Sequence, residues 1–237
     1  MRHCDKPRFW LNTKTVTDMQ EDYSDQKEAE DPLDDDLIDG LVAVGGTVTS
    51  ESLLRAYGMG VFPWSSDPMV TWWSPDPRAI FDLESYQPSR SLRKRIRRAG
   101  WTFAFDRSFE GVMRLCAEPT PDRPSTWITS DFIAAYTELS RQGLAHSVEV
   151  YEEGELVGGL YGVTLGGFFG GESMFHRKAD ASKAAVFALV QHLRERGFVL
   201  LDAQVPNPHL ASLGAVEIPR QEYLARLRHA ISLPVTF

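Results

Sequence analysis

The sequence predicts an α+β fold built around one mixed β-sheet. Its elements run as helices, then a meander of strands, then a helix, a strand and a helix. A strand that follows a helix after a meander implies one crossover into an otherwise antiparallel sheet. The composition, 43% hydrophobic over 237 residues, is that of a globular protein. We expect three parts: an acidic, disordered extension (1–36), a small N-terminal domain (37–78) and a larger domain with the mixed sheet (79–237).

The negative charge is concentrated near the N-terminus. Residues 18–39 hold eleven acids and one lysine, whereas residues 40–237 hold 20 bases and 21 acids. Few apolar residues and high charge predict disorder in 12–36, and mimicry of nucleic acid by this stretch is an open alternative. Since the remainder is nearly neutral, the low pI of about 5.3 does not argue against a local nucleic-acid site.

Start and stop residues delimit the expected helices. With their caps, these are 49–60 (Thr49 or Ser50), 89–100 (Ser89 or Ser91), 129–143 (Ser130) and 180–197 (Asp180), joined by amphipathic helices at 108–118 and at 221–231. The stretch 146–175 alternates, turns at "EEGE" and then runs nearly all apolar, which predicts the meander. Residues 61–78 contain three Trp, four Pro and no helical period. We expect aromatic packing and fixed turns to hold this segment, which either lines a cleft or forms a structural lid.

One expected helix is strongly basic. Six of the nine residues from 90 to 98 are basic and none is acidic: Arg90, Arg93, Lys94, Arg95, Arg97 and Arg98. Like charges at this density cost helix stability, so a purely structural helix usually mixes signs. The helix is therefore a candidate site for a polyanion such as a phosphate backbone, the alternative being a solvated basic face.

Polar residues interrupt two apolar strands. In "FVLLDAQVP", the period of two places Asp202 and Gln204 on one face of a strand, and Glu172 ends the strand "GGFFGGES". Polar groups on buried strands are costly unless they have partners, so we expect the three to converge on a pocket at one edge of the sheet. Alternatively, Asp202 caps a turn, Gln204 satisfies backbone groups and Glu172 pairs with a neighbouring base (Arg177 or Lys178).

The sequence shows no motif for a metal site, a serine nucleophile or a nucleotide phosphate. The chain has two cysteines without a pattern, which suggests a reducing, cytoplasmic location, and no Cys/His spacing typical of a metal site. It has no nucleophile elbow, no phosphate-binding loop and no apolar run long enough to span a membrane. We expect three histidines (His146, His176 and His209) to be structural.

Several stretches together closely resemble the leucyl/phenylalanyl-tRNA–protein transferase family. They are "LVAVGGTVTSESLLRAYGMGVFPW", "WWSPDPR", "STWIT", "VGGLYGV", "FFGGESMF", "ASKAA" and "LLDAQVPNPHLASLGAVEIPR". The resemblance covers most of 37–237, and the acidic extension has no counterpart in it. It implies a small N-terminal domain followed by an acetyltransferase-like (GNAT) domain. It also implies transfer of Leu or Phe, and less well Met, from aminoacyl-tRNA to an N-terminal Arg or Lys of a protein. The product is an N-degron for bacterial proteolysis, and no ATP, metal or other cofactor is required.

The resemblance also implies roles for particular residues. Asp202 and Gln204 form the catalytic pair, and Glu172 binds the cationic acceptor. The walls of the aminoacyl side-chain pocket are Leu160, Phe169, Met174, Val186, Leu189 and Leu201. Residues expected to stack on the 3′-terminal adenosine or to line the acceptor cleft are Tyr57, Trp64, Trp127 and Tyr136, with Asn207 supporting the pair. The basic helix is expected to hold the tRNA backbone. We expect the protein to be a monomer, because nothing in the sequence suggests an obligate partner.

Two rival functions use the same features. An acyl-CoA N-acyltransferase needs a glycine-rich pyrophosphate turn before its main helix, but here "RKADAS" places the negative Asp180 at that turn. A non-catalytic RNA-binding protein would use the basic helix and leave the three polar strand residues unexplained.

Overall fold

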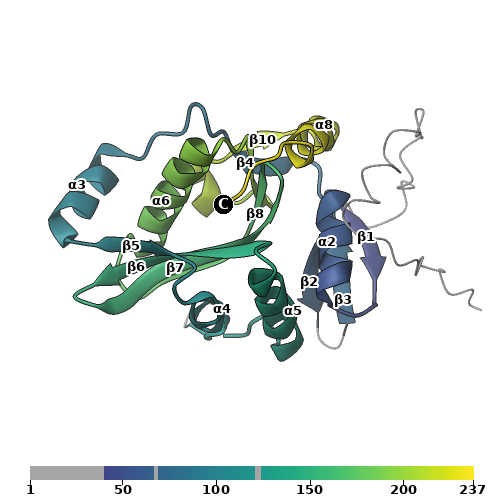
Figure 1. Ribbon diagram of the computed structural model, residues 1–237, viewed down its shortest axis with the longest axis horizontal. Coiled ribbons are helices and arrows are strands. Elements are labelled where there is room, and N and C mark those ends of the chain that lie inside the picture. Colours follow the sequence, from purple (N-terminus) through teal and green to yellow (C-terminus); the bar gives the residue numbers. More distant parts are fainter. Residues whose placement is uncertain (1–39, 67–68, 121–123) are drawn as a thin grey trace, which may run out of the picture. The chain divides into compact units, whose positions relative to one another are not determined.

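Two β-sheets organise the described part of the chain (Figure 1). The structure is a computed structural model that describes residues 40–66, 69–120 and 124–237. The acidic extension 1–36 lies outside these residues, so its predicted disorder stays a prediction. All described residues belong to one unit, Leu37–Phe237.

The smaller sheet has three antiparallel strands in the order β1-β3-β2. They are β1 (Leu41–Val44), β2 (Phe62–Ser66) and β3 (Met69–Trp73). The segment 61–78 therefore contains a hairpin that the sequence analysis did not predict, because proline within a short run argues against a strand. Pro63 nevertheless lies within β2, paired with Trp72.

The larger sheet has seven strands in the order β10-β4-β9-β8-β7-β6-β5. They are β4 (Arg78–Phe81), β5 (Thr102–Phe105), β6 (Ala145–Glu152), β7 (Glu155–Leu165), β8 (Phe168–His176), β9 (Leu200–Gln204) and β10 (Val216–Ile218). Strands β8 and β9 are parallel and every other pair is antiparallel. This arrangement confirms the predicted α+β class, the meander and the single crossover. The division into domains at residue 78 stays a prediction.

Helices cover both faces of this sheet (Figure 1). The described helices are α2 (Ser50–Gly58), which lies beside the smaller sheet, α3 (Arg90–Ala99), α4 (Phe109–Ala117), α5 (Ser130–Arg141), α6 (Ala181–Arg196), α7 (Pro208–Leu213) and α8 (Arg220–Ile231). One core cluster joins buried side chains of α2, α4, α5 and α8, and the other joins those of α6, against which Ile96 and Ala99 of α3 pack. Burial on both faces explains the near-continuous apolar runs of the central strands.

The helix ends follow the predicted caps with two exceptions. Ser89 accepts a hydrogen bond from the backbone N–H of Leu92 (3.1 Å) at the start of α3. Thr129, and not Ser130, occupies the cap position of α5. Asp180 occupies the cap position of α6 with a left-handed backbone (φ +69°), and its side chain makes no capping bond but pairs with Lys183 at 2.8 Å.

Candidate functional site

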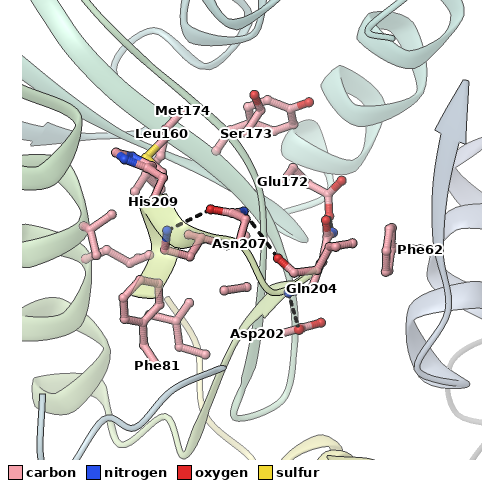
Figure 2. A pocket seen from close by; sticks show the side chains of 18 of the residues that line it. Phe62, Phe81, Leu160, Glu172, Ser173, Met174, Asp202, Gln204, Asn207 and His209 are labelled. Atoms are coloured by element: carbon pink, nitrogen blue, oxygen red, sulfur yellow. Dashed lines mark hydrogen bonds between the residues drawn. The ribbon is translucent and has the colours of Figure 1, made fainter. Parts of the chain in front are cut away.

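A pocket of about 500 Å³ opens beside the carboxyl ends of β8 and β9 (Figure 2). Its apolar part is formed by side chains of β4, β7, β8, β9, α6 and α7: Phe81, Leu160, Met174, Val186, Leu189, Leu201 and Leu210. Its polar part includes Glu172, Asp202 and Gln204, which the sequence analysis expected to converge. The pocket thus joins an apolar slot to a small set of polar groups, the usual composition of a site for an organic ligand.

Two β-bulges shape the polar part of the pocket. On β8, Ser173 pairs with Tyr161 and Gly171 with Gly162, so Glu172 is the extra residue. On β9, Gln204 pairs with Ala79 and Asp202 with Ile80, which leaves Ala203 as the extra residue. Bulges redirect side chains and are common next to active sites.

Glu172 links Gln204 to two buried tyrosines. The Gln204 Nε2 donates to Glu172 Oε1 at 2.7 Å, and the Tyr136 hydroxyl donates to Glu172 Oε2 at 2.9 Å. The hydroxyls of Tyr136 and Tyr57 are 2.5 Å apart. Both carboxylate oxygens of Glu172 therefore have partners.

Asp202 binds a fully buried arginine. Its Oδ1 accepts from Arg78 Nε at 2.9 Å and its Oδ2 from Arg78 Nη2 at 2.6 Å, while the Tyr223 hydroxyl donates to Oδ2 at 2.9 Å. Arg78 is 0% and Asp202 1% exposed. The Oδ1 of Asp202 also accepts from the backbone N–H of Gln204 at 2.8 Å. A buried pair of this geometry satisfies both charges.

Burial perturbs the titration of the site. Burial, with a smaller contribution from the nearby Asp202, raises the pKa of Glu172 from 4.5 to about 7, against the opposing effect of the tyrosine hydrogen bonds. Burial also raises the pKa of Tyr57 and Tyr136 well above 10, so both stay neutral donors. Burial lowers the pKa of Arg78, but the charge and hydrogen bond of Asp202, with smaller contributions from Tyr223 and Glu172, together outweigh burial and the net shift is upward. A carboxyl that titrates near neutrality in a pocket is typical of functional sites.

The structure places the predicted pocket walls in one slot, with one exception. Leu160, Met174, Val186, Leu189 and Leu201 line the pocket. Phe169 does not: it is 0% exposed and packs in the core, where its ring lies 5.7 Å from that of Phe237. It supports the wall from behind.

The two tyrosines expected to stack on the adenosine or to line the acceptor cleft do not line the pocket. Tyr57 is 1% and Tyr136 0% exposed, so neither ring can stack on a base. They hold Glu172 instead. Trp64, Trp127 and Asn207 do line the pocket, and Trp64 is 42% exposed. The Asn207 side chain caps α7 by accepting from the N–H of Leu210, and it makes no hydrogen bond to the Asp202/Gln204 pair.

The basic helix is confirmed as α3, with its basic side chains on the surface. All six basic side chains are exposed: Arg90, Arg93, Lys94, Arg95, Arg97 and Arg98. Within the part of the chain that the structure describes, none of them forms an ion pair with an acidic side chain. Leu92 alone is buried and anchors the helix.

Sequence reasoning missed three residues of the site. Arg78 ends the quoted motif "WWSPDPR" but carries no periodic signal, and its partner Asp202 lies 124 positions away. Tyr223 looks like an ordinary apolar position of α8. His209 lines the pocket, although it was expected to be structural. Glu172 does not form the ion pair that was the alternative to a role in the pocket. Arg177 pairs with Glu118 and Lys178 with Glu152 instead.

Neither a metal cluster nor a membrane span is found in the ranges that the structure describes. No group of three or more His, Cys, Asp or Glu side chains there is placed to hold a metal ion. No helix among those residues is long and apolar enough to cross a bilayer.

Comparison with known proteins places the chain in a family. The model described as leucyl/phenylalanyl-tRNA protein transferase matches residues 80–228, and the model of that transferase's N-terminal domain matches residues 46–76. The chain belongs to the leucyl/phenylalanyl-tRNA–protein transferase family. The first match contains the three polar residues of the pocket (Glu172, Asp202 and Gln204), whereas Arg78 lies between the two matched segments.

Relatives within the transferase family match most of the chain. The leucyl/phenylalanyl-tRNA–protein transferase of Shewanella piezotolerans is 51% identical over 191 residues, which is 80% of this chain and 81% of the relative. That of Shewanella baltica is 51% identical over 197 residues, 83% of each. The predicted family and enzyme class, an aminoacyltransferase, are thereby confirmed. The acyl-CoA and non-catalytic alternatives are not supported.

Among solved structures, L-PGS from Bacillus licheniformis is 18% identical, with a TM-score of 0.42 over 70% of this chain and 56% of that one. A GCN5-related N-acetyltransferase-like protein from Streptococcus suis is 15% identical, with a TM-score of 0.34 over 71% of this chain and 64% of that one.

Proposed function

We propose that this transferase moves Leu or Phe, and less well Met, from aminoacyl-tRNA to the N-terminal Arg or Lys of acceptor proteins. The product is a new peptide bond and an N-degron. The observation that carries the proposal is the placement of Gln204 between a carboxylate and an apolar slot in one pocket. No ATP is needed because an aminoacyl ester is already activated, and the enzyme only has to position an amine against it.

The apolar slot suits the donor side chain. Its walls present aliphatic groups, the ring of Phe81 and the thioether of Met174, none of which needs a hydrogen bond. Such a slot separates side chains that differ by a methylene only modestly, which fits acceptance of Leu, Phe and Met together. Trp64 and Trp127, at the rim, offer ring faces for the terminal adenine.

Glu172 fixes the orientation of the Gln204 amide. A carboxylate can only accept, so the Nε2 of Gln204 faces Glu172 and its Oε1 is left as an acceptor for the substrate. That oxygen accepts a hydrogen bond from the acceptor's α-amino group and aims its lone pair at the ester carbonyl. Glu172 supplies the negative charge that favours a cationic acceptor terminus.

The chemical step needs no strong base. A peptide α-amino group has a pKa of about 7.7–8.0, so about a tenth is neutral near pH 7. The amine nitrogen attacks the ester carbon, the bond from that carbon to the ribose oxygen breaks, and the ribose hydroxyl of the tRNA leaves with a proton. The nitrogen loses one proton as the C–N bond forms. Asp202 already has Arg78 and Tyr223 as partners, which supports a holding role for it rather than proton uptake.

The exposed bases of α3 are proposed to hold the tRNA backbone. Phosphate contacts of this kind give affinity and salt dependence but little sequence selectivity. We also propose that the enzyme works as a cytoplasmic monomer, without a metal.

The test is a transfer assay with purified protein. Radiolabelled Leu-tRNA and a peptide with N-terminal Arg are mixed without ATP or CoA, and the label in the peptide is counted. The same peptide with an acetylated N-terminus is the control. Label in the free peptide alone is the expected result, and no label in either peptide would refute the proposal.

A further inference from the structure

The guanidinium of Arg78 is fixed from several directions at once. Beyond its two bonds to Asp202, its Nη1 donates to the carbonyl of Gly60 at 3.1 Å and its Nη2 to the Tyr223 hydroxyl at 3.2 Å. Its Cζ lies 4.8 Å from the centre of the Phe62 ring and 4.3 Å from that of Tyr223. Segments from both sheets and from α8 therefore determine where this charge sits.

Asp202 transmits that position to the backbone of Gln204. The carboxylate that Arg78 holds also accepts from the Gln204 N–H at 2.8 Å. Gln204 has a φ of +64°, in the left-handed region, directly after the bulge residue Ala203. A non-glycine residue there costs about 1–3 kcal/mol and persists only where its surroundings enforce it.

We propose that Arg78 is a positioning residue for aminoacyl transfer, holding Gln204 through the carboxylate of Asp202. The proposal rests on the proposed function of Gln204 in aiming the acceptor amine. Arg78 is walled off by protein and does not line the pocket, so it acts on the substrate only through its neighbours. Arg78 neutralises the charge of Asp202 and fixes its carboxylate, which in turn holds the backbone N–H of Gln204 in its left-handed conformation.

The decisive variant is Arg78→Lys, which keeps the charge but loses the two-pronged contact. We expect kcat for aminoacyl transfer to fall roughly 10- to 100-fold, since displacement of a reacting group by about 1 Å lowers the rate by up to about 10². The KM for acceptor peptide and the Kd for tRNA should stay within about twofold, since uniform binding is not lost. Ser147→Ala, which removes a buried hydrogen bond to Glu149 outside the pocket, is the control with unchanged kcat.

A double-mutant cycle separates positioning from general destabilisation. If Arg78 acts through Asp202, Arg78→Lys combined with Asp202→Asn should be no slower than the slower single variant, within about threefold. Losses that multiply, or a KM that changes more than kcat, would overturn the proposal. If Arg78→Lys does not fold, Tyr223→Phe tests the proposal in its place. This variant removes one hydrogen bond to Asp202 and should lower kcat by roughly 3- to 10-fold. An unchanged kcat refutes the proposal.

Amide hydrogen exchange at Gln204 tests the coupling independently of transfer. Exchange of this amide should be faster in Arg78→Lys than in wild type, while amides in β6 keep their protection. Unchanged exchange at Gln204 refutes the coupling. If the wild type shows no transfer but the exchange still responds, the function of the site is wrong and the structural coupling stands.

Discussion

Glu172→Gln should change how the reaction depends on pH. The variant keeps the shape of the side chain, and its amide oxygen can still accept from Gln204. It removes only the carboxyl whose pKa burial raises to about 7. In wild type, kcat/KM for the acceptor then requires two deprotonations, those of Glu172 and of the free α-amino group.

The size of the effect follows from the two pKa values. Glu172 is about nine-tenths ionised at pH 8 and about one-tenth at pH 6, while the amine has a pKa of about 7.7–8.0. Below about pH 6, log(kcat/KM) for wild type should therefore rise with a slope approaching about 2 per pH unit. Glu172→Gln should leave a slope of about 1, from the amine alone.

The assay is initial-rate transfer of labelled Leu to an N-terminal Arg peptide between pH 5 and 8.5. Glu217→Gln, an exposed position of β10 outside the pocket, is the matched control and should keep the wild-type slope. Equal slopes for wild type and Glu172→Gln would show that the carboxyl does not have to be ionised. The idea that its charge attracts the acceptor would then be wrong.

The same substitution makes a prediction for stability. A carboxyl whose pKa is raised on folding binds more protons in the native state, so the free energy of unfolding falls as pH rises from 4.5 to about 7. At about 1.4 kcal/mol per pH unit, the loss of stability above pH 7 is at most about 3.5 kcal/mol. Glu172→Gln should therefore be more stable than wild type at pH 8 but not at pH 4.5. Urea unfolding at both pH values measures this, and a variant that is less stable at pH 8 contradicts it.

Three further predictions concern the tRNA, the donor and the extension. Replacing Arg93, Lys94 and Arg97 by Ala should weaken tRNA binding. The slope of log K against log salt concentration should become shallower by about 2, because each phosphate contact contributes about 0.7–0.9. Unchanged affinity in filter binding would mean that α3 does not bind the tRNA backbone. Val186→Phe narrows the slot and should lower kcat/KM for Phe-tRNA at least about tenfold more than for Leu-tRNA, and equal losses in competition assays exclude Val186 as a selector. Deleting residues 1–36 should leave transfer largely intact, and a truncated protein without activity shows that the extension is required.

Local patterns in the sequence predicted six of the seven described helices, the meander and the convergence of the three polar residues, but not the short helix α7 (Pro208–Leu213). The crossover rule places the strand of Glu172 beside that of Asp202 and Gln204 without knowledge of any contact, whereas the bulge at Ala203 interrupts the period of two that was expected between Asp202 and Gln204. The partner of Asp202 could not be found in this way, because Arg78 is far away in the chain and reaches it only across paired strands.

Local sequence patterns also did not predict which aromatic side chains are buried. Tyr57 lies in the expected helix 49–60 and Trp64 in the aromatic segment 61–78 that follows it, and nothing in the sequence shows that one is buried and the other exposed. The packing of α2 against α5 and α8 decides it. The two bulges are likewise set by register between strands, so the redirected Glu172 and Gln204 are properties of the assembled sheet.

Single-turnover transfer by Gln204→Met tests most directly the claim that an oriented amide performs the work of this site. Methionine has a similar length but lacks the carbonyl oxygen that aims the amine and the N–H that reaches Glu172. With enzyme in excess over Leu-tRNA and saturating acceptor peptide, we expect the rate to fall about 10²-fold or more, while tRNA affinity is unchanged. A rate within about threefold of wild type would mean that Gln204 does not position the amine.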